Sequence, residues 1–186
     1  MLKTILIILS FSITSHAIVE SQIQQVMDTK VKQVLNILKN KALTQTQKEK
    51  KSITVMNSVF DYTTMAKISL GKKWKNLSST EKKQFTKAFE HKIKYSYVDK
   101  LRLYNNQKVI SKKLKKIKPT RITLENQIVG KTDTYKVIYL FYKHKKTNQW
   151  YIYDVRLAGV SIIQTYRKQF KAFLKTKTFK QLLNSL

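Results

Sequence analysis

The chain has 186 residues with no cysteine, three glycines and one proline, and 38 basic residues against 10 acidic ones give a formal net charge of +28. Without cysteine the chain forms neither a disulfide framework nor a thiolate metal site. So basic a composition would suggest nucleic-acid binding. The lysines are nevertheless spread through every segment, and we interpret the charge as a solvated surface, with attraction to anionic membranes as a secondary consequence.

The first 17 residues have the features of a secretory signal peptide. Lys3 provides a positive start, an apolar run extends from Ile5 to Ile13, and Ala17 ends a stretch of small residues suited to cleavage. This run is too short for a membrane-spanning helix, although an uncleaved anchor is the alternative. We therefore expect export, which removes nucleic acid as the usual partner, and a single mature domain over residues 18–186.

The first half of the mature chain shows helical periodicity and capping signals. Asp61 is positioned as an N-cap and Gly71 as a C-terminal stop, and Ser78 with Glu81 forms a capping box. The predicted helices cover residues 18–39, 44–59, 62–70 and 78–104.

The second half changes to strands and then returns to helix. Residues 108–118 form a lysine-rich edge strand, protected by its charge. Further strands are predicted over residues 121–129, 135–142 and 150–157. The strand over residues 135–142 is apolar on both faces, so it is covered on both sides or covers something. The sequence predicts an α+β fold with an antiparallel sheet of about four strands.

The stretch from Trp150 to Arg167 organises this prediction. A strand runs to Gly159, after which Ser161 and Gln164 form a capping box for an amphipathic helix. Such a helix can fold back across the sheet, and an incomplete fit would leave an apolar hollow. Thr178 with Gln181 caps a last helix.

Signals for catalysis are weak. His91 and His144 are isolated among lysines, and no phosphate-binding loop, nucleophile elbow or zinc-binding helix is present. We interpret Asp61 as a cap, Asp99 as a helix-surface charge, and Asp154 as a strand residue that balances a nearby base. We therefore expect no enzyme, no metal and no cofactor.

Three groups of motifs resemble the MlaC family, the exported phospholipid carriers of an ABC lipid-transport system. The first is FDYTTMA at residues 60–66, followed by LGKKW at 70–74 and STEKKQF at 79–85. The second is WYIYDV at residues 150–155 with GVS at 159–161, and the third is the closing segment at 174–186 with its Phe179. Thr165 departs from the asparagine of many relatives, and Ile138 and Leu140 replace residues that are often polar.

The resemblance implies a nuclear-transport-factor-like fold, in which a curved antiparallel sheet and helices enclose an apolar pocket. It also implies a soluble periplasmic carrier, expected to be monomeric, whose cargo is phospholipid. Its partners would be an inner-membrane ABC transporter complex, with a membrane-anchored substrate-binding component, and an outer-membrane lipoprotein–porin complex. The carrier would thereby maintain the lipid asymmetry of the outer membrane.

Aromatic and branched residues would contact the lipid tails, although the same residue types form ordinary cores. The predicted lipid-binding residues are Phe89, Tyr97, Leu101, Val137, Tyr139, Phe141, Tyr153, Val155, Val160, Ile163 and Tyr166. Arg167 suits either a phosphate or a structural ion pair with a neighbouring acid. Two other functions stay open: an exported basic adaptor without a ligand, and an enzyme on the same scaffold.

Overall fold

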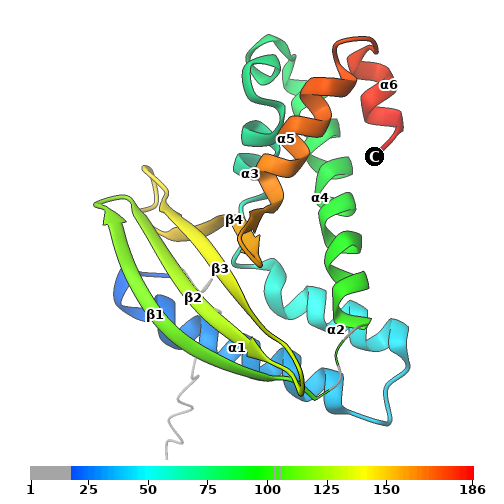
Figure 1. Ribbon diagram of the computed structural model, residues 1–186. Helices are drawn as coiled ribbons and strands as arrows, with labels where there is room; N and C mark the ends of the chain where they lie inside the picture. Colours follow the sequence, from blue (N-terminus) through cyan, green and yellow to red (C-terminus); the bar gives the residue numbers. More distant parts are fainter. Residues whose placement is uncertain (1–17, 103, 105) are drawn as a thin grey trace, which may run out of the picture.

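The structure is a computed structural model that describes residues 18–102, 104 and 106–186, so the predicted signal peptide lies outside the described residues. The described chain forms an antiparallel sheet with helices at one side and at one end (Figure 1). The helical elements are η1 (Glu20–Gln22), α1 (Ile23–Lys39), α2 (Gln45–Asn57), α3 (Tyr62–Leu70), η2 (Gly71–Asn76), α4 (Ser79–Arg102), α5 (Ile162–Phe173) and α6 (Phe179–Asn184). The strands are β1 (Lys108–Lys118), β2 (Arg121–Val129), β3 (Thr134–Lys143), β4 (Trp150–Leu157) and β5 (Val160–Ser161).

Capping boxes begin three of the helices; those at Ser78 and Thr178 were predicted, and the one at Thr44 was not. Thr44 and Thr178 each accept a hydrogen bond from the backbone of a glutamine three residues later, and that glutamine side chain accepts one in return. Ser78 and Glu81 make the same reciprocal pair. These local bonds satisfy backbone N–H groups that have no partner within the helix.

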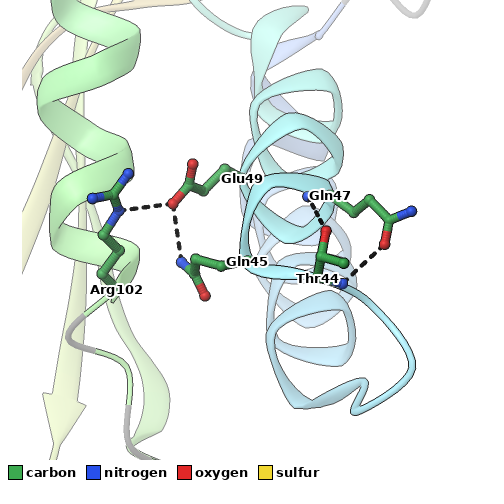
Figure 2. Close-up of polar contacts among 5 residues, drawn as sticks. All are labelled: Thr44, Gln45, Gln47, Glu49 and Arg102. Atoms are coloured by element: carbon green, nitrogen blue, oxygen red, sulfur yellow. Dashed lines mark hydrogen bonds and ion pairs between the residues drawn. The ribbon is translucent and has the colours of Figure 1, made fainter.

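The N-terminal turn of α2 also holds the end of α4 (Figure 2). Glu49 on α2 accepts hydrogen bonds from Arg102 Nε at 2.8 Å and from Gln45 Nε2 at 3.1 Å. The hydrogen bond from Arg102 lowers the pKa of the Glu49 carboxyl. This contact connects two helices that approach each other at their ends.

The sheet has the strand order β1-β2-β3-β4-β5, and every neighbouring pair is antiparallel. The four long strands match the predicted ones, and the two-residue β5 was not predicted from the sequence. It arises because Ala158 and Gly159 both have positive φ, of 47° and 84°, which closes a two-residue hairpin after β4.

The register separates the sheet into two sides. The side that α1 covers, here called the inner face, carries Ile122 opposite Phe141 and Leu124 opposite Tyr139. We call the opposite side of β1 and β2 the open face. On the inner face, Gln24 of α1 donates a hydrogen bond of 2.6 Å to Ser111 Oγ on β1. Figure 1 shows α1 lying behind the strands, with the open face toward the reader.

The direction of α5 corrects one expectation. The sequence suggested that this helix folds back across the sheet, but α5 leaves the end of β4 and packs beside α3 and α4 (Figure 1). The reason lies in its apolar stripe: Phe170 meets Phe85 and Phe89 of α4 at ring-centroid distances of 5.7 and 5.5 Å. The inner face is instead covered by α1, whose Ile23 and Met27 are fully buried.

The buried apolar residues therefore form two groups. The sheet cluster lies between the inner face, α1 and the end of α2, and consists of Ile18, Ile23, Met27, Val59, Ile122, Leu124, Val137, Phe141, Trp150, Ile152 and Val155. The helical cluster lies among α3, η2, α4, α5 and α6, and consists of Met65, Ala66, Leu70, Trp74, Leu77, Phe85, Phe89, Ile93, Ile163, Phe170 and Leu182.

Candidate functional site

The two clusters meet at Phe60 and Ile162, which pack partly buried against both. Phe60 follows α2 beside the edge of β4, where Asp61 N donates to Ile152 O at 3.0 Å and Ile152 N donates to Val59 O at 2.8 Å. Ile162 is the first residue of α5. We call the surroundings of these two side chains the junction, and treat it as the candidate site because it is where apolar groups of the sheet and the helices come together.

Four of the predicted residues belong to the sheet cluster or pack against it. Val137, Phe141 and Val155 are buried in the sheet cluster, and the partly buried Tyr139 packs against them. Tyr139 lies on β3 between Leu124 of β2 and Val155 of β4. Burial raises the pKa of the Tyr139 hydroxyl to about 12, so it stays neutral at physiological pH.

Three more predicted residues belong to the helical cluster or pack against it. Phe89 and Ile163 are buried in the helical cluster, and Tyr166 packs against it. The rings of Phe89 and Tyr166 meet edge to face, with centroids 5.1 Å apart. The Tyr166 hydroxyl lies 2.9 Å from Ser96 Oγ on α4. A polar group thus ends the aromatic contact between α4 and α5.

Val160, Tyr153 and Leu101 belong to neither cluster. Val160 of β5 is 61% exposed, although its register places it beside Leu157 on the row that includes Val137. Tyr153 stacks with the Arg121 guanidinium at 5.4 Å and contacts the ring of Tyr142. Leu101 is partly buried near the end of α4, and the side chain of Tyr97 lies outside the described residues.

Two hollows occur in the helical part of the described structure. One has a volume of about 170 Å³, and its lining residues are Lys92, Tyr166, Gln169, Phe170, Phe173, Leu182, Ser185 and Leu186. The other has a volume of about 250 Å³, and its lining residues are Thr63, Trp74, Lys82, Lys83, Thr86, Lys87 and Glu90. Both are smaller than the ~300–1,000 Å³ of typical ligand pockets. Tyr166, in the smaller hollow, is the one predicted lipid-binding residue among these lining residues. Neither hollow is lined by a residue of the sheet, and because α5 packs beside α3 and α4, the hollow expected between the sheet and α5 is not one of them.

Sequence reasoning missed a polar group on the inner face. Asn126 of β2 is 2% exposed, and its Oδ1 has no hydrogen-bond partner among the described residues. It lies between Ser111 and Val137 in the cross-strand register. The signal was present in the sequence, because Asn126 continues the inward positions Ile122 and Leu124 at a spacing of two.

Asp61 and Asp154, two of the acidic residues considered from the sequence, make hydrogen bonds that stabilise the fold. Asp61 caps α3 as predicted, since its Oδ1 accepts from Thr64 N at 2.8 Å, and Tyr142 OH donates to its Oδ2. Asp154 was expected to balance a base. Instead, its carboxylate accepts from Ser161 Oγ at 2.6 Å and from Ile163 N at 3.1 Å.

For Arg167 the sequence left two roles open, binding a phosphate or forming a structural ion pair. In the structure its guanidinium lies against the backbone of Gly71, and among the described residues it makes no salt bridge to a carboxylate. Across the described chain, no group of three or more His, Asp or Glu side chains is placed to hold a metal ion. None of its helices is both long enough and apolar enough to span a bilayer.

The fold and the junction define an α+β protein with an open five-stranded antiparallel sheet, packed by helices, whose apolar interior is divided in two. The family model described as "MlaC protein" matches residues 28–186. The chain therefore belongs to the MlaC family.

Two similar proteins fit this assignment. The intermembrane phospholipid transport system binding protein MlaC of Haemophilus influenzae is 25% identical over 120 residues, which are 63% of this chain and 56% of that protein. The match thus spans little more than half of the relative. A solved phospholipid-binding protein from Ralstonia solanacearum, in complex with a phospholipid, has a TM-score of 0.75 at 20% identity. That similarity covers 87% of this chain and 92% of that one, and it supports the shared fold.

Proposed function

We propose that this protein is a periplasmic phospholipid carrier, without catalytic activity, that holds acyl chains at the junction of its two apolar clusters. The observation that carries the proposal is the meeting of both clusters at the partly buried side chains of Phe60 and Ile162. Membership of the MlaC family and the name of the Haemophilus influenzae relative support it.

The physical requirement for such a carrier is large. Each buried methylene contributes about 0.8 kcal/mol, so one chain of about 15 methylenes exposed to water costs on the order of 12 kcal/mol. Lipid therefore crosses an aqueous gap slowly without a protein that covers its tails. A site for tails needs apolar contact area but no catalytic group, which agrees with the apolar character of the junction.

The predicted residues would contact the lipid tails from both clusters. Val137, Tyr139, Phe141 and Val155 would contact the tails from the sheet, and Phe89, Ile163 and Tyr166 from the helices. Tail entry would require the clusters to separate around Phe60 and Ile162. The exposed Val160 would then meet the lipid at the rim of the site.

The wider role follows from the family. After cleavage of the signal peptide at residue 17, the mature domain of residues 18–186 would act as a monomer. It would pass lipid between an inner-membrane ABC transporter complex and an outer-membrane lipoprotein–porin complex, and so help to keep the outer leaflet free of phospholipid.

Organic extraction of the purified mature protein, followed by mass spectrometry, tests the carrier. We expect phospholipid in near-stoichiometric amount after expression with export. A folded protein that contains no lipid, and takes up none from phospholipid micelles, would contradict the proposal. It would favour the basic adaptor, whose binding would weaken as salt is raised.

A further inference from the structure

The open face of the sheet carries an unusual concentration of positive charge at β1. Six of the eleven residues of this edge strand are lysine, and all six are exposed. The cross-strand register places Lys113, Lys115 and Lys118 on the open face, opposite Glu125, Thr123 and Arg121 of β2. Lys118 and Arg121 are thus like charges directly opposite each other, an arrangement that destabilises a sheet.

The described residues of this face do little to neutralise it. Glu125 is the carboxylate within the two-strand patch, and it is already paired with Lys136 of β3 at 3.0 Å. Arg121 lies over the rings of Tyr142 and Tyr153 at 5.6 and 5.4 Å. On the other side of β1, Lys116 is paired with Glu20 at 2.6 Å. The positive charge of Lys113, Lys115 and Lys118 on the open face is therefore directed outward and suits an anionic partner.

Exposed apolar groups lie within the same patch. Ile110 is 41% exposed and shares the open face, opposite Gln127, and Ile117 of β1 is 49% exposed. Figure 1 shows β1 at the free edge of the sheet, with no described helix in front of β1 and β2. Lysines interleaved with exposed isoleucines suit a surface that is anionic at its headgroups and apolar beneath.

We infer that the open face of β1 and β2 is a docking surface for a bilayer that contains anionic phospholipid. The patch is a broad, outward-facing surface of separate lysine side chains, which fits many mobile headgroups better than one fixed ligand. Each lysine near an anionic surface strengthens binding by about fivefold at low salt. The inference goes beyond carriage, because docking by this face does not require cargo at the junction.

Vesicle co-sedimentation with the mature chain tests the inference. The vesicles would contain phosphatidylcholine alone or with about 30 mol % phosphatidylglycerol, enough to give a strongly negative surface. The test variant combines Lys113→Gln, Lys115→Gln and Lys118→Gln. The matched control combines Lys168→Gln, Lys171→Gln and Lys175→Gln, three exposed lysines of α5 and the segment after it.

We expect the wild type to prefer the anionic vesicles, and the open-face variant to bind them on the order of 100-fold more weakly. The α5 control removes the same net charge and should lose less than about fivefold. Ile110→Ser should weaken the binding that persists at about 0.5 M salt, where the charges are screened. Equal losses in both triple variants would overturn the inference in favour of diffuse charge.

Equal binding of wild type to neutral and anionic vesicles would also overturn the inference, because headgroup charge would then not guide docking. Lipid extraction from the same preparations separates this result from the carrier proposal. Vesicle docking by a protein that never contains lipid would refute carriage alone. Unchanged lipid content in an open-face variant that no longer docks would support both proposals.

Discussion

The backbone N–H of Ile163 donates a hydrogen bond of 3.1 Å to Oδ1 of Asp154, a carboxylate that is 4% exposed. The other oxygen of the same carboxylate accepts from Ser161 Oγ at 2.6 Å. One buried charge on β4 therefore satisfies the first turn of α5, where the helix dipole favours a negative group. This contact fixes the start of α5 against β4, at the boundary between the sheet cluster and the helical cluster.

Replacing Asp154 by asparagine should destabilise the protein by about 1–3 kcal/mol, because charge-assisted hydrogen bonds in a buried setting are lost. Ser161→Ala removes the hydroxyl that donates to Asp154 and caps Gln164 N, and should cost about 1 kcal/mol. Urea unfolding of the three proteins measures both differences. A D154N variant as stable as the wild type would show that Asp154 does not hold α5 in place.

Two glycines allow a matched test of backbone conformation. Gly71 adopts φ 58° and ψ −126°, and a Cβ there would lie 3.4 Å from Arg167 Nε. Gly159 has φ 84° in an open hairpin turn, with no atom within 4 Å of a Cβ. Gly71→Asn should cost about 1–3 kcal/mol, whereas Gly159→Asn should cost less than about 1 kcal/mol, since asparagine suits such turns. Thermal unfolding of both variants checks the order, and equal costs would refute it.

Tyr142 should make part of the free energy of unfolding sensitive to alkaline pH, so that the protein becomes less stable as pH rises. Burial, together with its hydrogen bond to Asp61, raises the pKa of Tyr142 to about 12, from the ordinary value near 10. The unfolded state therefore ionises first, so this contribution is fully present below about pH 10 and is lost as pH rises through about 12.

Tyr142→Phe should remove this part of the pH dependence. After allowance for partial exposure, the free energy of unfolding of the wild type should fall by about 1 kcal/mol more than that of Y142F between about pH 9 and 12. Chemical denaturation at a series of pH values measures the difference. Parallel curves for the two proteins would show that Tyr142 ionises no differently in the folded state.

The lipid site is tested by a pair of exposed valines. Val160 of β5 is 61% exposed, and Val19 is 44% exposed near the start of η1. Glutamate at either position should change stability by less than about 0.5 kcal/mol, because surface substitutions are tolerated. We expect Val160→Glu to lose most of the co-purified phospholipid and Val19→Glu to retain it. Full lipid content in a folded V160E protein would remove Val160 from the proposed site.

Val137→Asp examines the buried side of the same row. Val137 is 7% exposed and contacts the sheet cluster. A carboxylate there would be placed against the lipid tails, which is unfavourable for a charged group, so a folded variant should lack lipid. A failure to fold would show instead that the side chain belongs to the permanent core. Circular dichroism together with lipid extraction distinguishes the two results.

Local signals explain why much of the fold could be predicted. Thr44, Ser78 and Thr178 cap helices through bonds to residues three positions away, which a linear pattern contains in full. The strands over residues 108–118, 121–129 and 150–157 were predicted with the bounds that the structure shows. Branched and aromatic residues with a period of two mark such segments without reference to their partners.

Tertiary contacts decided what the pattern left open. The amphipathic stripe of α5 was visible, but its partner was not, because Phe170 can pack equally well on a sheet or on another helix until α4 presents Phe85 and Phe89. The division of the predicted lipid-binding residues between two clusters follows from that choice. Tyr153 is an aromatic strand residue like other candidates, but it lies under Arg121. The reason is a β-bulge in β4, opposite Leu140 and Phe141 of β3, which shifts the register at this point.

By itself, the sequence determined the α+β order of elements, the capped helix starts at Asp61, Ser78 and Thr178, and the lysine-rich edge strand, since each depends on residues a few positions apart. The tertiary structure alone decided that α1 covers the inner face, that α5 turns toward α4, and that Phe60 and Ile162 join two apolar interiors. The physical reason is that burial is non-directional: an apolar side chain favours removal from water but does not specify which distant surface removes it.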